Sequence, residues 1–308
     1  MLSKSLINFF KVPAPRSASS DDPEARRLNV VLLNHDSAKG SLYRIDFKTD
    51  LTPGKTTSFE VELTLFNLLK PYPAEISQTE RQYVLFKGNH YYYSLYVTKS
   101  QTTTVTLASD KVESYSQLKP TSKSDSTITY GPYENVKPFE QNEMQVHYEN
   151  NSPFLVVTNL VRTIEVSHWG NIAVEETIDL YHYGALLKGP FSRFDYMRRI
   201  GGAASVKSFK TLLPPSAADV YYRDEIGNIS TSNLRTPNKL SKAVEPLDFE
   251  IRPRFPLFGG WRTHYTIGYN LPIYQYLFNK GKNLLFFILK KLEFIKNDEI
   301  IFADLNQL

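Results

Sequence analysis

The sequence predicts an all-β fold of two tandem antiparallel β-sandwich-like domains, and three observations support this. Aromatic residues make up 13% of the chain, with 20 Tyr and 19 Phe, and aromatic side chains favour strands. Short runs of alternating apolar and polar residues recur between turn residues. At 308 residues the chain is also too long for one ordinary domain, so two domains with separate cores are expected.

The first domain is predicted over residues 28–138, after a mobile leader at residues 1–27. The leader is rich in Pro, Ser and charge, a composition that cannot offset the entropy lost on ordering. The stretch 118–142 carries three Pro and little periodicity, so we place the junction between the domains inside it. Strands of this domain are predicted at 42–47, 58–65, 82–86, 91–97 and 102–107.

The second domain is predicted over residues 139–278. Its clearest feature is a hairpin, in which strands at 161–169 and 172–181 flank a turn at Gly170 and Asn171. The remaining residues, 279–308, form a short tail that is compatible with one amphipathic helix. Further strands of the domain are predicted at 144–148, 154–158, 206–213, 220–223, 248–252 and 263–269.

Glu176 is a candidate buried charge. Strict alternation along the returning strand of the hairpin places it on the apolar side. Because an unpaired buried carboxylate is costly, we expect an ion pair with an arginine such as Arg193 or Arg198. A metal-dependent enzyme that uses Glu175, Glu176 and His168 is a further hypothesis, but the histidines lack metal-ligand spacing, which favours half-buried structural roles.

Composition excludes several classes of function. The net charge is only +4, with 36 basic residues interspersed among 32 acidic ones, so nucleic acid is not an expected partner. No cysteine is present, which excludes disulfides, thiol catalysis and zinc-thiolate sites, and we expect neither a cofactor nor a metal. The apolar run at 284–289 has six residues, whereas a membrane span needs about 20.

Two N-glycosylation sequons occur. Asn228 begins Asn-Ile-Ser directly after a predicted turn at 224–227, so we expect an exposed acceptor. Asn150 begins Asn-Asn-Ser, but Pro153 follows and hinders the conformation that an acceptor adopts, so we expect no modification there.

The segment 252–261 combines rigid prolines, aromatic side chains and two glycines. Such a segment can form an exposed patch for a protein partner, or equally a packed corner between strands. The residues of this candidate partner surface are Arg252, Arg254, Phe255, Phe258 and Trp261.

Long strings of this sequence resemble the ribophorin I family. They are HYENNSPF at 147–154, IEVSHWGNIAVEE at 164–176, LKGPFSR at 187–193, DVYYRDEIGN at 219–228 and EIRPRFPLFGGW at 250–261. A looser similarity covers the first domain, so the resemblance spans residues 28–278. Both ends depart from the family pattern, because the signal peptide, the membrane helix and the cytosolic tail are not matched, and we expect a product truncated at both ends.

The resemblance implies a non-catalytic, lumenal subunit of the oligosaccharyltransferase of the endoplasmic-reticulum membrane. That complex moves a preassembled glycan from dolichyl pyrophosphate to the Asn of Asn-X-Ser/Thr in nascent proteins, and another subunit carries the catalytic centre. Implied roles are assembly and substrate presentation, and implied partners are the other subunits, nascent polypeptides and the translocon. Asn228 matches a glycosylated position of the family. The alternative is an independent secreted β-sandwich module that binds peptide or glycan.

Overall fold

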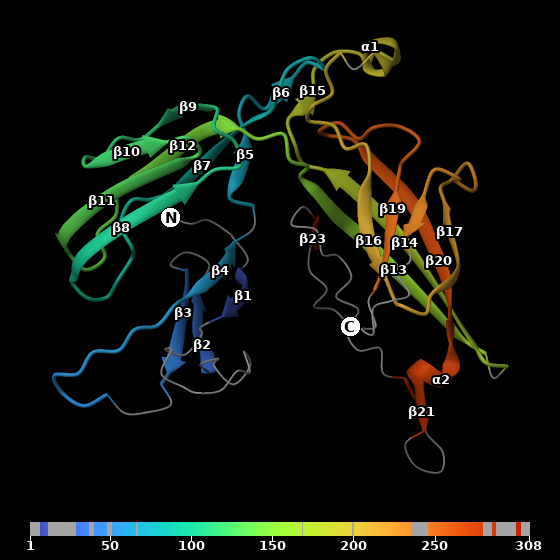
Figure 1. Cartoon of the computed structure of the whole chain (residues 1–308), viewed down its shortest axis with the longest axis horizontal. Coiled ribbons are helices and arrows are strands. Elements are labelled where there is room, and N and C mark those ends of the chain that lie inside the picture. Colours follow the sequence, from blue (N-terminus) through green and yellow to red (C-terminus); the bar gives the residue numbers. More distant parts are fainter. Residues whose placement is uncertain are drawn as a thin grey trace. The chain divides into compact units, whose positions relative to one another are not determined.

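The computed structural model describes residues 7–11, 29–36, 40–47, 51–65, 67–167, 169–198, 200–235, 246–279, 285–287 and 300–302. Strands dominate these residues, and most pairings are antiparallel, so the predicted all-β class is confirmed (Figure 1). The chain forms two compact units built from alternating segments of sequence. Unit 1 comprises 1–70, 85–106 and 114–146, and unit 2 comprises 71–84, 107–113 and 147–308. The domain boundary at residues 138 and 139 stays a prediction.

Described strands from the first half of the chain form four sheets among themselves. A three-stranded antiparallel sheet has the order β10-β11-β8, with β8 at Thr98–Thr106, β10 at Thr121–Ser124 and β11 at Thr127–Val136. A four-stranded sheet has the order β5-β7-β12-β9, with β5 at Leu69–Pro71, β7 at Tyr83–Asn89, β9 at Val112–Tyr115 and β12 at Glu143–Glu149. Two-stranded sheets join β1 (Ile7–Lys11) to β4 (Glu62–Leu65), and β2 (Asn29–Asp36) to β3 (Gly40–Asp46).

Two stretches of this half differ from their predicted structure. Residues 91–97 form a loop instead of a strand. Its backbone is held by side chains, since Gln101 Oε1 accepts a hydrogen bond from the Tyr92 N–H (2.9 Å), and such local bonds compete with a strand ladder. Conversely, the non-periodic stretch 118–142 contains β10 and β11. Gly131 and Pro132 lie where the register of β11 against β8 shifts, which obscures the alternation.

Unit 2 contains the predicted hairpin in a five-stranded sheet of order β17-β20-β14-β13-β23. Ile164 opposes Val174 across the pair β13 and β14, as the shared apolar face requires. Only β23 pairs in parallel within this sheet. The bounds are β13 Leu155–Val166, β14 Asn171–His182, β17 Ala218–Arg223, β20 Arg262–Pro272 and β23 Ile300–Phe302. A three-stranded sheet has the order β16-β19-β18, with β16 at Phe209–Leu213, β18 at Asn233–Arg235 and β19 at Leu247–Ile251.

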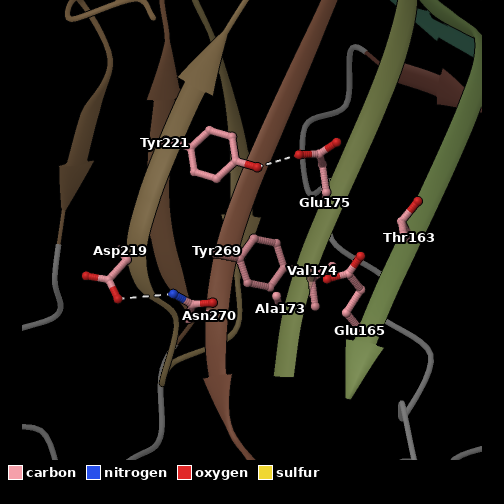
Figure 2. Close-up of a pocket in the computed structure, with 9 residues that line it drawn as sticks. All are labelled: Thr163, Glu165, Ala173, Val174, Glu175, Asp219, Tyr221, Tyr269 and Asn270. Atoms are coloured by element: carbon pink, nitrogen blue, oxygen red, sulfur yellow. Dashed lines mark hydrogen bonds between the residues drawn. The ribbon is translucent and has the colours of Figure 1, made fainter. Parts of the chain in front are cut away.

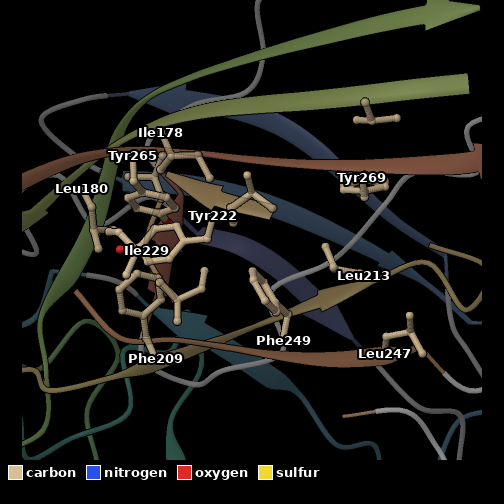
Figure 3. Close-up of a cluster of buried hydrophobic side chains, with 14 of the residues drawn as sticks. Ile178, Leu180, Phe209, Leu213, Tyr222, Ile229, Leu247, Phe249, Tyr265 and Tyr269 are labelled. Carbon is tan, nitrogen blue, oxygen red and sulfur yellow. The ribbon is translucent and has the colours of Figure 1, made fainter. Parts of the chain in front are cut away.

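The core of unit 2 lies between these two sheets (Figure 3). Leu180 and Tyr265 contribute from the five-stranded sheet, whereas Phe209 and Phe249 contribute from the three-stranded sheet. Every second residue of β14 is apolar and buried, except for Glu176 and the buried His182, so one face of the sheet is removed from water. Two sheets that bury facing apolar sides form a sandwich, as predicted.

The remaining elements of unit 2 are short. Strand β6 (Glu75–Ile76) pairs in parallel with β15 (Leu186–Leu187), and the helices are α1 (Arg193–Met197) and α2 (Ile273–Tyr276). Within the predicted helical tail, the described residues instead form strands, namely β21 (Leu277–Asn279), β22 (Leu285–Phe287) and β23, and the other tail residues lie outside the described part. The predicted leader is described only at β1. No helix in the described part is long and apolar enough to cross a membrane.

Candidate functional sites

The face of the five-stranded sheet that points away from the core carries a row of polar side chains. Alternation along β14 places Glu175, Thr177 and Asp179 on this face, opposite the buried Ile178 and Leu180. Register then brings Glu175 opposite Gly268 and Asp179 opposite His264 on β20. The sheet therefore brings carboxylates together with polar groups from four strands.

Glu175 is bound by two side chains of β17. The Tyr221 hydroxyl donates a hydrogen bond to its Oε2 (2.5 Å), and Arg223 forms an ion pair with the same oxygen (2.8 Å). Gly268 permits this contact, because a Cβ there would lie 2.1 Å from the Tyr221 ring. Burial raises the pKa of Tyr221, and the neighbouring Glu175 carboxylate raises it further. Tyr221 therefore stays a neutral hydrogen-bond donor to Glu175.

Asp179 is bound in the same way, farther along the face. His264 Nδ1 lies 2.6 Å from its Oδ1, and the Asn159 side chain donates to its Oδ2 (3.1 Å). The hydrogen bond from His264 is the main reason that the pKa of Asp179 lies below its usual value. Each oxygen of this carboxylate is therefore bonded to a side chain of a neighbouring strand.

A shallow open depression of about 220 Å³ lies on this face (Figure 2). Ala173 is its smallest lining side chain, and the pairs Tyr221 with Glu175 and Asn270 with Asp219 form part of its rim. In each of these two rim pairs one side chain donates a hydrogen bond to the other. The lining residues are Thr163, Glu165, Ala173, Val174, Glu175, Asp219, Tyr221, Tyr269 and Asn270.

Glu176 lies on the opposite, inner face, with 13% of its side chain exposed. Its partner is Arg162, whose Nε lies 2.8 Å from Oε1, and the Tyr269 hydroxyl also donates to Oε1 (3.3 Å). The expectation that Arg193 or Arg198 pairs with it is therefore wrong, because Arg162 is the directly opposing residue on β13.

Two members of the proposed enzyme trio do not converge. Glu175 and Glu176 point to opposite faces of the sheet, and His168 lies outside the described residues. Within the part of the chain that the structure describes, no three His, Asp or Glu side chains gather as a metal site would require.

Asn228 lies in an exposed, well-braced turn. The Asp224 Oδ1 accepts hydrogen bonds from the backbone N–H groups of Ile226 (3.0 Å) and Gly227 (3.1 Å). Arg254 binds the Asp224 carboxylate through two nitrogens (2.5 and 3.1 Å) and also donates to the Asn228 carbonyl oxygen (3.3 Å). The hydrogen bond from Arg254 is the first cause of the lowered pKa of Asp224. The acceptor side chain is thus presented to solvent on a rigid turn.

Asn150 belongs to a buried polar network that the sequence did not reveal. Only 6% of the residue is exposed, and its Oδ1 accepts from the Ser152 N–H (2.9 Å). Gln82, 1% exposed, donates from Nε2 to the Asn150 carbonyl (2.9 Å) and accepts from the Ala185 N–H (2.8 Å). The buried, hydrogen-bonded amide of Gln82 thus has a structural role, and no local pattern in the sequence predicts it.

The neighbouring Glu149 is a buried charge that was also missed. Arg81 lies 2.7 Å from its Oε1, Asn151 donates to the same oxygen (2.7 Å), and Lys111 lies 3.4 Å from Oε2. Burial raises the pKa of Glu149, but the hydrogen bonds from Arg81 and Asn151 outweigh it, so the pKa is lowered overall. Glu149 is the last residue of β12. Its charged partners Arg81 and Lys111 are distant in sequence, so the alternation of apolar and polar residues does not predict them.

The candidate partner surface at 252–261 is partly a packed corner. Phe258 is 5% exposed, with its ring centroid 5.5 Å from that of Phe191 and 5.4 Å from that of Trp261. Trp261 is half-buried, whereas Phe255 is 43% exposed. Among the arginines of the segment, Arg254 binds Asp224 as described above, and the exposed Arg252 binds Glu250 (3.0 Å).

Helix α1 continues this aromatic corner through Tyr196, whose ring lies 5.8 Å from that of Phe191. Gln78 holds the start of the helix, accepting from the Ser192 N–H (2.9 Å) and donating to the Ser192 carbonyl (3.0 Å). The outer side of the helix presents Phe194, 64% exposed, and Met197, 73% exposed. A firmly anchored element thus displays large apolar side chains to solvent.

These observations define a β-sandwich-bearing chain whose polar groups brace turns and sheet faces. The family model for Ribophorin I matches residues 5–304, a wider range than the strings at 28–278 suggest. The chain therefore belongs to the Ribophorin I family.

Curated relatives agree with this family. Dolichyl-diphosphooligosaccharide–protein glycosyltransferase subunit 1 of Caenorhabditis elegans is 44% identical over 84% of this chain and 46% of its own length. Subunit 1B of Arabidopsis thaliana is 46% identical over 77% of this chain and 50% of its own length, and subunit 1B of rice is 44% identical over 77% and 49%. The chain thus spans about half the length of these curated relatives.

Proposed function

We propose that the chain acts as a non-catalytic subunit of a dolichyl-diphosphooligosaccharide–protein glycosyltransferase, in the assembly of the complex and the presentation of substrate. The observation that carries this proposal is the 44% identity, over 84% of the chain, to a relative named as subunit 1 of that enzyme. Such a chain works on the lumenal side of the endoplasmic-reticulum membrane, beside the catalytic subunit, nascent polypeptides and the translocon.

The hydrogen bonds of three carboxylates favour a non-catalytic role. Glu175, Glu176 and Asp179 each accept short hydrogen bonds from an Arg, Tyr or His side chain. A general acid or base exchanges a proton with the substrate, and it works best when its own pKa lies near the working pH. The pKa of Asp179 is instead lowered, away from neutral pH, which keeps this carboxyl group ionised.

Asn228 is proposed as the glycosylated residue of the described part. Its exposure and the turn braced by Asp224 and Arg254 leave room for a bulky glycan. Asn150 is proposed to stay unmodified, since its buried side chain is engaged with Ser152.

The surface proposed for other subunits is Phe255 and Arg252 together with the outer side of α1. Aromatic residues, Met and Arg are enriched at protein interfaces, and Phe194, Met197 and Phe255 are all substantially exposed. The fixed position of Ser192 on Gln78 reduces the entropy cost of docking.

Affinity purification from cells that express the tagged, full-length protein tests this proposal. We expect the catalytic subunit of the glycosyltransferase to co-purify, and a Phe194→Ser, Phe255→Ser variant to recover less of it, because both side chains lie at the proposed surface. Peptide mapping of the same preparation is expected to find glycan on Asn228 and none on Asn150. A matched Phe47→Ser change, at an exposed aromatic residue of unit 1, should leave recovery unchanged. Purification of the folded protein without any transferase subunit would refute the proposal.

A further inference from the structure

The loop that precedes β8 is an exposed aromatic surface held in a fixed conformation. We define the aromatic loop as residues 91–97 together with Phe139. Its backbone is fixed at Tyr92 by Gln101, at Tyr96 by the Ser94 hydroxyl (3.0 Å), and at Phe139, whose N–H donates to the Ser94 carbonyl (2.9 Å). Its exposed apolar members are Tyr92 (67%), Tyr93 (55%), Leu95 (57%), Tyr96 (78%), Val97 (58%) and Phe139 (51%).

Local order rather than disorder keeps these side chains in water. Phe139 adopts a positive φ of 59°, which is uncommon for a residue with a bulky side chain. Its ring contacts that of Tyr93, with centroids 5.5 Å apart, and Tyr91 contacts Tyr133 at 5.3 Å. A clustered exposed apolar surface of this kind marks a binding region.

Strand β8, which the loop enters directly, is an edge strand. Among the described strands it pairs with β11 alone, so one side of its backbone has no strand partner there. Natural edge strands are usually short or carry charges and prolines that prevent further pairing. Strand β8 has nine residues, and Lys99 is its single charged residue, with no proline. The opposite edge, β10, has four residues, of which Lys123 is charged.

We propose that β8 and the aromatic loop together bind an extended, weakly charged polypeptide by strand addition. The unpaired N–H and C=O groups of an edge strand are complementary to another extended backbone, which selects a polypeptide as the occupant. The uncharged loop sequence YYYSLYV directly precedes β8 and presents exposed apolar side chains, which favour an occupant with apolar side chains of its own. The occupant is therefore a chain rich in β-branched or aromatic residues, with few charges. This inference concerns unit 1 alone and stands whether or not the chain joins a transferase.

Fluorescence anisotropy with the purified full chain tests the inference. The probe is a labelled nine-residue peptide of alternating Val and Thr, the length of β8. We expect a Thr102→Lys, Thr104→Lys variant to bind at least about tenfold more weakly, because charges on an edge oppose strand addition. The same change at Ser122 and Ser124, on the opposite edge, is the matched control and should leave binding unchanged. Circular dichroism and thermal unfolding confirm that each variant is folded.

Peptides N-methylated at alternate residues separate backbone pairing from side-chain docking. Because an added strand turns every second N–H toward β8, methylation of one alternating set is expected to abolish binding, and methylation of the other set to leave it intact. A Tyr92→Ser, Tyr96→Ser variant should bind several-fold more weakly through loss of apolar contact. Equal binding of both methylated peptides, or a Lys variant that binds like wild type, would overturn the inference.

Discussion

Replacing Phe249 with Ala is expected to lower the free energy of unfolding by about 3–5 kcal/mol. Phe249 lies in the middle of β19 and is 2% exposed, in the core between the two sheets of unit 2. Truncation removes the transfer energy of the ring and leaves a cavity that rigid strands on both sides cannot fill. Urea-induced unfolding, followed by circular dichroism, measures the change.

Phe194→Ala is the matched control. This side chain is 64% exposed on α1, so its truncation is expected to change the free energy of unfolding by less than about 0.5 kcal/mol. Equal effects of the two substitutions would contradict the assignment of the core to the space between the sheets.

The second large effect concerns His182 and pH. This residue ends β14 and is fully buried, and burial lowers the pKa of its ring to about 4, from an ordinary value of 6.5. As pH falls below about 6.5, His182 therefore binds a proton in the unfolded chain, whereas in the folded chain it binds one only near pH 4. Stability is lost across this window, by about 1.4 kcal/mol for each pH unit and about 3 kcal/mol in total.

Comparison with His182→Gln isolates this contribution. The variant carries no titratable group at the site, so its unfolding free energy should depend less on pH between 6.5 and 4, whatever its stability at pH 7. Urea unfolding at several pH values provides the two slopes. Parallel pH profiles for the two proteins would show that His182 does not titrate differently on folding.

Alternation predicted the hairpin of unit 2, but not its register. A two-residue turn at Gly170 and Asn171 would place Glu165 opposite Glu176. In the structure the Ser167 N–H donates to the Asn171 carbonyl (2.8 Å), and Arg162 opposes Glu176 instead. Alternation and burial predict that Glu176 needs a charged partner. The identity of that partner depends on the length of the turn.

The aromatic loop shows why composition predicts a strand at 91–97 that the chain does not form. Tyr and Val favour strands, but here Gln101 and Ser94 bond the backbone and hold it in an irregular path. One of these side chains, Gln101, belongs to the following strand, so the loop sequence by itself does not predict its hydrogen bond. The buried network around Gln82 was hidden for the same reason, since its partners Asn150 and Ala185 are distant in sequence.

Glycan transfer by a complex that contains Glu175→Gln, Glu176→Gln protein tests the non-catalytic role most directly. A catalytic acid or base contributes about 10²–10⁴-fold to rate, whereas structural carboxylates contribute none to the chemical step. We expect transfer to an Asn-X-Thr peptide, normalised to assembled complex, to stay within about twofold of wild type. A loss of about 100-fold or more, in a complex that assembles normally, would contradict the supporting role proposed for this chain.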